Sequence, residues 1–195
     1  MQSQSVTMLH PEPLPLRPAL PCPNGFRIRY LRADEGPVWA HIEHIVNEFV
    51  NADAALDRFQ WEFAPFPLQI IQRCLVVETT SGEVVGTTSV WYHPAFQGGL
   101  WGRLHWVAIL PEYQGRGLAR PLLVAALNRM AVFHQRAFLD SDTSRIKALR
   151  LYLDYGFRPR LQSSKDYAAW RLVAQQLQHP VLQQSLRADN PADSV

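Results

Sequence analysis

One stretch of this sequence, from Trp106 to Ala119, restricts the possible folds more than any other. An apolar strand pattern there stops at Pro111, and a loop with two glycines then opens an amphipathic helix. Glycines let a backbone approach a ligand closely, and a helix N-terminus offers unpaired N–H groups and the positive end of the helix dipole. Pro121 has no N–H, which keeps the helix start near Gly117. The pattern predicts a phosphate-binding loop, although a simple turn before a helix gives the same glycines.

Two familiar phosphate loops do not match this stretch. No Gly-Lys-Ser or Gly-Lys-Thr ends the loop, so it is not a Walker loop. Arg120 occupies the place of the third glycine of a dinucleotide-binding fingerprint. The sequence therefore excludes both of these nucleotide-binding motifs.

The composition fits one globular domain, with or without tails. Of the 195 residues 47% are hydrophobic, which is enough for a single core that needs no disulfide or metal. The net charge of +2 is small for a protein that binds nucleic acid. Cys22 and Cys74 are too few for a disulfide framework, and no apolar run approaches the roughly 20 residues that cross a bilayer. We expect a cytoplasmic protein that binds neither nucleic acid nor membrane.

A proline-rich opening and a polar end flank a segment in which strand and helix patterns alternate. We expect a tail at residues 1–24, a single domain at residues 25–178 and a second tail at residues 179–195. Segment 51–67 fits a short helix or a loop, and the pattern around Trp170 favours a helix capped by Asp166 over a strand. The remaining expected elements are strands at 26–30, 74–79, 83–92, 100–110 and 137–143 and helices at 38–49, 117–134 and 145–155.

A second motif follows the glycine loop. After the loop and one further strand come Ala148-Leu149-Arg150-Leu151-Tyr152 and Gly156-Phe157. This combination resembles the GCN5-related N-acetyltransferase (GNAT) family, over roughly Phe26 to Pro159. The resemblance implies an α/β fold in which helices flank a mixed, largely antiparallel sheet.

The resemblance also implies a cofactor site. In the family this loop holds the pyrophosphate of acetyl-CoA, and the end of the preceding strand pairs with the pantetheine arm and orients the thioester. Arg145 replaces an asparagine that is frequent in the family, so it either reaches a phosphate or caps Asp142. The residues implied are Ile109 and Leu110 on the strand, Gln114, Gly115, Arg116, Gly117, Leu118 and Ala119 in the loop, and Arg145.

Two side chains are candidates for acid and base catalysis. Tyr152 lies where related enzymes place the tyrosine that protonates the coenzyme thiolate; the alternative is a half-buried core tyrosine. His105 lies on the strand expected to face the acceptor, and an ordinary histidine pKa near 6.5 suits proton removal close to neutrality. It also matches the position of a catalytic histidine in the arylalkylamine branch of the family. The alternatives are a rim histidine and an amine that loses its proton through water.

We therefore predict an N-acetyltransferase that moves the acetyl group of acetyl-CoA directly to a primary amine, without a metal. The acceptor, a small molecule or a peptide, stays open, and a homodimer is possible. One alternative is a non-catalytic domain that binds or senses acyl-CoA. Another is an enzyme for a longer acyl-CoA, in which aromatic residues would form the acyl tunnel. Otherwise the same aromatic set would line the pocket of a bulky acceptor. The set comprises Trp61, Phe63, Phe66, Trp91, Phe96, Trp101 and Trp106.

Overall fold

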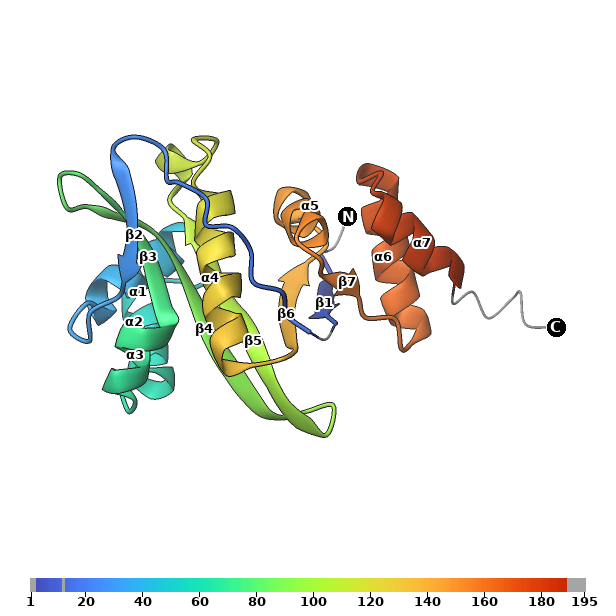
Figure 1. The fold of residues 1–195 in the computed structure, drawn as a ribbon, viewed down its shortest axis with the longest axis horizontal. Helices are drawn as coiled ribbons and strands as arrows, with labels where there is room; N and C mark the ends of the chain where they lie inside the picture. The colour runs from blue at the N-terminus through green and yellow to red at the C-terminus, as the bar shows by residue number, and fades with distance from the viewer. Residues whose placement is uncertain (1–2, 12, 189–195) are drawn as a thin grey trace. The chain divides into compact units, whose positions relative to one another are not determined.

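The computed structural model describes residues 3–11 and 13–188, in which groups of strands and groups of helices follow one another along the chain (Figure 1). The chain divides into two compact units. One is the continuous segment Pro15–His134, and the other combines the segments before and after it. Helices accompany mostly antiparallel strands, which confirms the predicted mixed α/β fold. Within the described residues, no helix has the length and apolarity that crossing a bilayer requires.

The unit Pro15–His134 is built on an antiparallel sheet in which β2, β3, β4 and β5 follow one another. Its strands are β2 (Phe26–Tyr30), β3 (Cys74–Thr79), β4 (Val84–Phe96) and β5 (Gly99–Ile109). Its helices are α1 (Gly36–Ile45), α2 (Ala52–Glu62), α3 (Pro67–Arg73) and α4 (Ala119–Phe133). Within segment 51–67, where a helix or a loop was expected, residues Ala52–Glu62 form a helix. The Asn51 side chain caps its first turn by accepting from the N–H of Ala54.

Different helices cover the two faces of this sheet. On one face, Tyr92 and Gly102 lie beside His134, the residue that follows α4. On the other face, Trp91 packs against Phe63, at the end of α2. Because consecutive side chains of a strand point to opposite faces, α1 and α2 lie across the sheet from α4. The buried aromatic cluster on the α1 and α2 side consists of Trp39, Phe59, Phe63 and Trp91.

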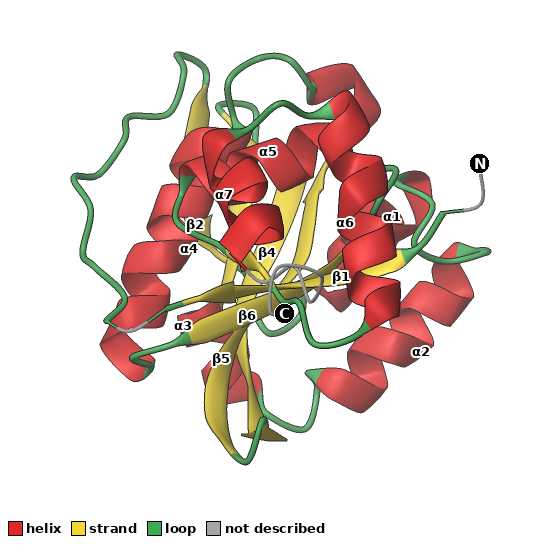
Figure 2. Ribbon diagram, turned by 90° about the vertical axis from the view of Figure 1, so that its right-hand side faces the viewer, coloured by secondary structure: helices red, strands yellow, loops and turns green. Residues whose placement is uncertain are grey.

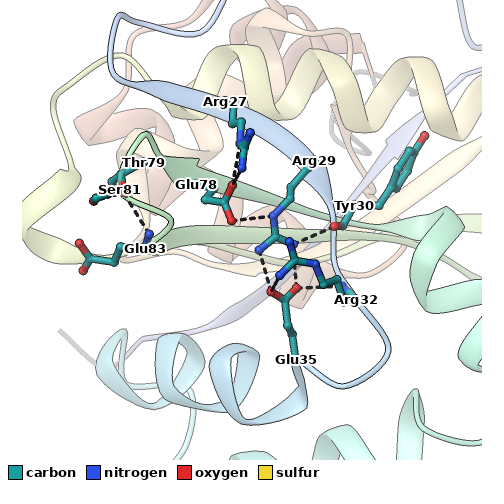
Figure 3. A network of polar contacts seen from close by, with 9 residues as sticks. All are labelled: Arg27, Arg29, Tyr30, Arg32, Glu35, Glu78, Thr79, Ser81 and Glu83. Carbon is teal, nitrogen blue, oxygen red and sulfur yellow. Dashed lines mark hydrogen bonds and ion pairs between the residues drawn. The ribbon is translucent and has the colours of Figure 1, made fainter.

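An ionic network fastens β2 and β3 to the start of α1 (Figure 3). Glu78 on β3 accepts hydrogen bonds from Nε of Arg27 at 2.6 Å and from Nε of Arg29 at 2.9 Å. Arg29 also donates through Nη1 and Nη2 to the two carboxylate oxygens of Glu35, each at 2.7 Å. Burial alone would raise the pKa of both carboxyls, but their arginine partners lower it below the ordinary value.

The second unit has β1 at its centre. Strand β1 (Ser5–His10) pairs antiparallel with β6 (Ala137–Asp142) on one side and with β7 (Arg158–Pro159) on the other. Its helices are α5 (Ile146–Asp154), α6 (Ser164–Gln176) and α7 (Pro180–Ala188). Figure 2 shows α6 and α7 side by side, in agreement with their contacts.

Both segments predicted to be tails contain regular structure. Strand β1 lies within residues 1–24, and its Met8 is fully buried. The predicted tail thus includes a strand with a buried side chain, and the prolines that suggested a tail begin only at Pro11. Helix α7 lies within residues 179–195, and its Leu182 is also buried. The domain boundaries at 24 and 178 stay a prediction.

The helix favoured around Trp170 is confirmed as α6, but its cap differs from the prediction. Ser163 is the N-cap residue, and its side chain accepts from the N–H of Asp166 at 3.2 Å. The Asp166 carboxylate accepts in return from the N–H of Ser163 at 2.9 Å. The two residues form a reciprocal capping box, so Asp166 lies inside the first turn rather than before it.

Candidate functional site

The predicted phosphate loop lies between a short 3-10 turn, Pro111–Tyr113, and the start of α4 at Ala119. Gly115 and Gly117 adopt positive φ angles of 75° and 81°, in the region that favours glycine. Leu118 precedes α4 without a capping side chain. The first N–H groups of a helix have no partner within the helix, so this end of α4 can accept an anionic oxygen.

The end of β5 meets the loop through a hydrogen bond. The Gln114 side chain donates from Nε2 to the backbone oxygen of Ile109 at 2.9 Å. The next backbone N–H, that of Leu110, donates to the oxygen of Val85 at 2.9 Å. Arg116 lies over the ring of Tyr113, 4.8 Å from its centroid. The structure thus brings Ile109 and Leu110 next to the loop.

A β-bulge interrupts β5 on the α1 and α2 side of the sheet. Thr87 pairs with Ala108 and Ser89 pairs with His105, so Trp106 and Val107 together oppose one residue of β4. Trp106 has a φ of 52°, which is rare for a bulky side chain. Ser89 donates from Oγ to the backbone oxygen of His105 at 3.0 Å. The bulge lets two consecutive side chains, His105 and Trp106, reach the same group.

That group is the carboxylate of Glu62, the last residue of α2. Its Oε1 lies 3.3 Å from Nε2 of His105, and its Oε2 accepts from Nε1 of Trp106 at 3.3 Å. The side chains of His105 and Glu62 are only 16% and 11% exposed. Burial alone would raise the pKa of the Glu62 carboxyl, but hydrogen bonds from His105 and Trp106 and the charges of His105 and Arg103 lower it.

Sequence reasoning did not select Glu62. It lies in the segment whose secondary structure was left open, and it is 44 residues from Trp106 in the chain. No motif marks such a pair. Only a correct placement of α2 beside β5 would have identified it.

A hollow of about 490 Å³ opens on the surface formed by α2 and the residues before it. Phe49 connects the hollow to the bulge, because its ring centroid lies 5.3 Å from that of Trp106. Arg58 lies over the Trp61 ring at 5.3 Å, and Trp61 is 72% exposed. The residues that line the hollow are Phe49, Ala54, Asp57, Arg58 and Trp61.

The predicted aromatic set therefore divides. Phe63, Trp91 and Trp101 are buried, which places them in the core. Trp61 borders the hollow and Phe66 is partly exposed. An aromatic wall exists, but only part of the set contributes to it.

Two candidate residues, Tyr152 and Arg145, belong to the second unit. Tyr152 on α5 is nearly buried, and its ring centroid lies 6.0 Å from that of Phe157. Arg145 is the residue before α5, and its N–H donates to the backbone oxygen of Asp142 at 3.0 Å. The Asp142 carboxylate accepts from the N–H and hydroxyl of Ser144, and its pKa is lowered against the effect of burial, partly by the charge of Arg145. The backbone contact and this charge favour Arg145 as a partner of Asp142.

The described part of the chain contains no cluster of metal-ligating side chains. Among those residues, no three or more His, Cys, Asp or Glu side chains gather in a way that could hold an ion.

Comparison with known proteins agrees with this fold. The family model described as "Acetyltransferase (GNAT) family" matches residues 39–157, more than half of the chain. The chain belongs to this family of acetyltransferases. No curated protein sequence matches it.

Solved GNAT structures share the fold at low sequence identity. A GCN5-related N-acetyltransferase from Sphaerobacter thermophilus aligns with a TM-score of 0.60 and 21% identity over 80% of this chain and 48% of the other. A GNAT-family structure from Novosphingobium aromaticivorans gives 0.55 and 20%, over 82% and 61%. A tandem GNAT protein from the clavulanic acid biosynthesis pathway gives 0.57 and 15%, over 80% and 50%. The chain thus spans about half to three-fifths of these relatives.

Proposed function

We propose that this protein is an N-acetyltransferase that transfers the acetyl group of acetyl-CoA directly to a primary amine. The observation that carries the proposal is the uncapped start of α4, preceded by two glycines at positive φ. Such a backbone concentrates N–H donors and the positive end of a helix dipole on one spot. A pyrophosphate, with its closely spaced anionic oxygens, matches that spot.

The cofactor would be held by main chain more than by side chains. The N–H groups from Gly115 to Ala119 would bind the pyrophosphate, with the guanidinium of Arg116 beside them. Gln114 now donates to the oxygen of Ile109, which is the type of contact that an amide N–H of the pantetheine arm would make. The arm would therefore displace the Gln114 side chain and extend along the end of β5.

The reaction needs a neutral amine and a proton for the departing thiolate. His105 would take a proton from the acceptor ammonium, and the amine nitrogen would then attack the thioester carbon. The carbon–sulfur bond breaks, and the hydroxyl of Tyr152 would donate its proton to the sulfur. The nitrogen still carries two protons after the attack, and it would return one of them to the Tyr152 phenolate to give the neutral amide. Holding the two reactants in line removes much of the entropic barrier of a bimolecular step.

The hollow beside α2 is the proposed place for the body of the acceptor. Phe49 and Trp61 give it an aromatic wall, and Asp57 adds a carboxylate. An amine with a flat or apolar body would match the aromatic wall, with its ammonium group at Asp57 and away from Arg58, which also lines the hollow.

The first test is calorimetric titration with CoA and acetyl-CoA. Gly117→Trp places a side chain inside the loop, where φ is 81°. Gly82→Trp is the matched control, because Gly82 has a φ of 90° and open surroundings in the turn between β3 and β4. Wild type and the control should bind, and the loop variant should not. Equal binding by all three proteins would exclude the loop as the cofactor site.

A second step separates an enzyme from an acyl-CoA sensor. Tyr152→Phe keeps the packing against Phe157 and removes the hydroxyl. An acetyltransferase should lose turnover toward a panel of amines while it retains its affinity for acetyl-CoA. A protein that binds acetyl-CoA and acetylates no amine would instead favour the sensor.

A further inference from the structure

We propose that Glu62 is a positioning residue for His105, holding its imidazole in one tautomer and stabilising the imidazolium that forms when it takes a proton. The inference rests on the proposed role of His105 as base. Glu62 itself receives no proton and does not contact the acceptor.

The geometry supplies the first argument. The Glu62 carboxylate is bonded on both oxygens, by Nε2 of His105 and by Nε1 of Trp106, each at 3.3 Å. Trp106 therefore fixes the carboxylate, and the carboxylate fixes the imidazole. Since the bulge places both side chains on one side of β5, a regular strand would separate them.

Two local rules are broken at this one place, which supplies the second argument. A carboxylate at the C-terminal end of a helix faces the negative end of the helix dipole, and Glu62 is the last residue of α2. Trp106, its partner, adopts a positive φ that a bulky side chain rarely accepts. Sequences tolerate such conflicts chiefly at functional sites.

The surrounding charges favour an ionised Glu62. Arg103, also on β5, lowers the pKa of the Glu62 carboxyl through its charge. Burial raises the pKa of the Cys74 thiol on β3, and the negative charge of Glu62 raises it further. The thiol therefore stays neutral near neutral pH and adds no charge beside the pair.

The chemistry follows from the tautomer. A neutral imidazole that donates Nε2–H to Glu62 carries its lone pair on Nδ1. The acceptor ammonium transfers its proton to Nδ1, so one N–H bond breaks and one forms. The resulting imidazolium lies beside a fixed negative charge, which favours the charged form. The charge of Glu62 thus makes His105 a stronger base.

The test compares Glu62→Gln with Asp53→Asn. The first substitution keeps the shape and the bond to Trp106 and removes the charge. The second removes an equal charge from the exposed first turn of α2. NMR titration of His105 in the full chain should give a pKa lower by about one unit in Glu62→Gln, because an opposite charge at contact distance shifts a pKa by about 1–3 units. The Asp53→Asn value should equal that of wild type.

Activity is then measured against pH. The kcat/KM of Glu62→Gln should fall roughly tenfold or more, with its acid limb moved to lower pH, within the range of general-base effects. Glu62→Asp, which keeps the charge, should recover part of the rate. An unchanged His105 pKa in Glu62→Gln would overturn the proposal. So would a shifted pKa with unchanged kinetics, if His105→Gln is inactive. If His105→Gln retains full activity, the base assignment itself is wrong.

Discussion

His134, the residue that follows α4, shows how a single buried side chain can make stability depend on pH. Its Nε2 lies 3.2 Å from Nη1 of Arg73, which fits a neutral ring accepting from the guanidinium. Burial and the charge of Arg73 lower the pKa of His134 from 6.5 to about 4. Arg73 also lies over the Phe133 ring at 3.9 Å and donates to the backbone oxygen of Val90, so it cannot easily move away when the ring is protonated.

We predict a loss of stability in acid that depends on this ring. As pH falls from about 6.5 toward 4, the unfolded chain binds a proton at His134 before the folded chain does, so folding becomes less favourable. The loss of unfolding free energy should reach about 2–3 kcal/mol. This is less than the whole pKa shift of His134 would give, because water near the ring screens its charge. Urea unfolding from pH 7 to pH 4 should show a shallower decline for His134→Gln than for wild type. Parallel curves would contradict the assignment.

At the scale of elements, Arg27 and Arg29 of β2 differ in how much they stabilise the fold, although both lie on the same side of the strand. Arg29 is 17% exposed and joins both Glu78 and Glu35, whereas Arg27 is 66% exposed and pairs with Glu78. Arg29 thereby ties β2, β3 and the start of α1 together. The sequence showed only that both arginines lie on the polar side of a strand.

The difference predicts unequal costs of removal. Arg29→Met should lower the free energy of unfolding by about 2–4 kcal/mol, since it strips one partner from a buried carboxylate. Arg27→Met should cost less than about 1 kcal/mol, as exposed ion pairs usually do. Denaturant unfolding of the two variants under the same conditions measures the difference. Similar losses would mean that the network does not depend on Arg29.

Other elements show what local patterns can and cannot predict. The strands of the Pro15–His134 unit and the helix around Trp170 were predictable, because hydrophobic periodicity is a local property of the chain. The bulge at Trp106 was not, since nothing in the apolar run of β5 marks the residue that β4 leaves unpaired. Of the capping box formed by Ser163 and Asp166, the sequence indicated only Asp166, which was expected to cap the helix.

At the scale of the whole molecule, the N-terminal segment belongs to the core of the second unit. Strand β1 has a paired strand on each side, and its backbone connects residues far apart in sequence. The N–H of Gln4, the residue before β1, likewise donates to the Thr143 hydroxyl, 139 positions further along the chain. Removing β1 would leave β6 and β7 without their common partner.

Truncation of one side chain tests this arrangement. Met8→Ala should lower the free energy of unfolding by about 2–4 kcal/mol, because Met8 is fully buried and its loss leaves a cavity. Leu16→Ala is the control, as Leu16 is exposed in the proline-rich stretch, and it should change stability by less than about 0.5 kcal/mol. Thermal or chemical unfolding would separate the two. A small effect of Met8→Ala would show that β1 is dispensable.

The sequence by itself determined the family, the glycine loop before α4 and most of the strands and helices, because each depends on residues close together in the chain. Only the tertiary structure decided that Ser5–His10 is a central strand, that Glu62 meets His105 and Trp106, and that the hollow forms beside Phe49 and Trp61. These features join residues from distant elements. Their physical basis is burial and hydrogen bonding between surfaces that meet only after the chain has folded, and no local period in the sequence records them.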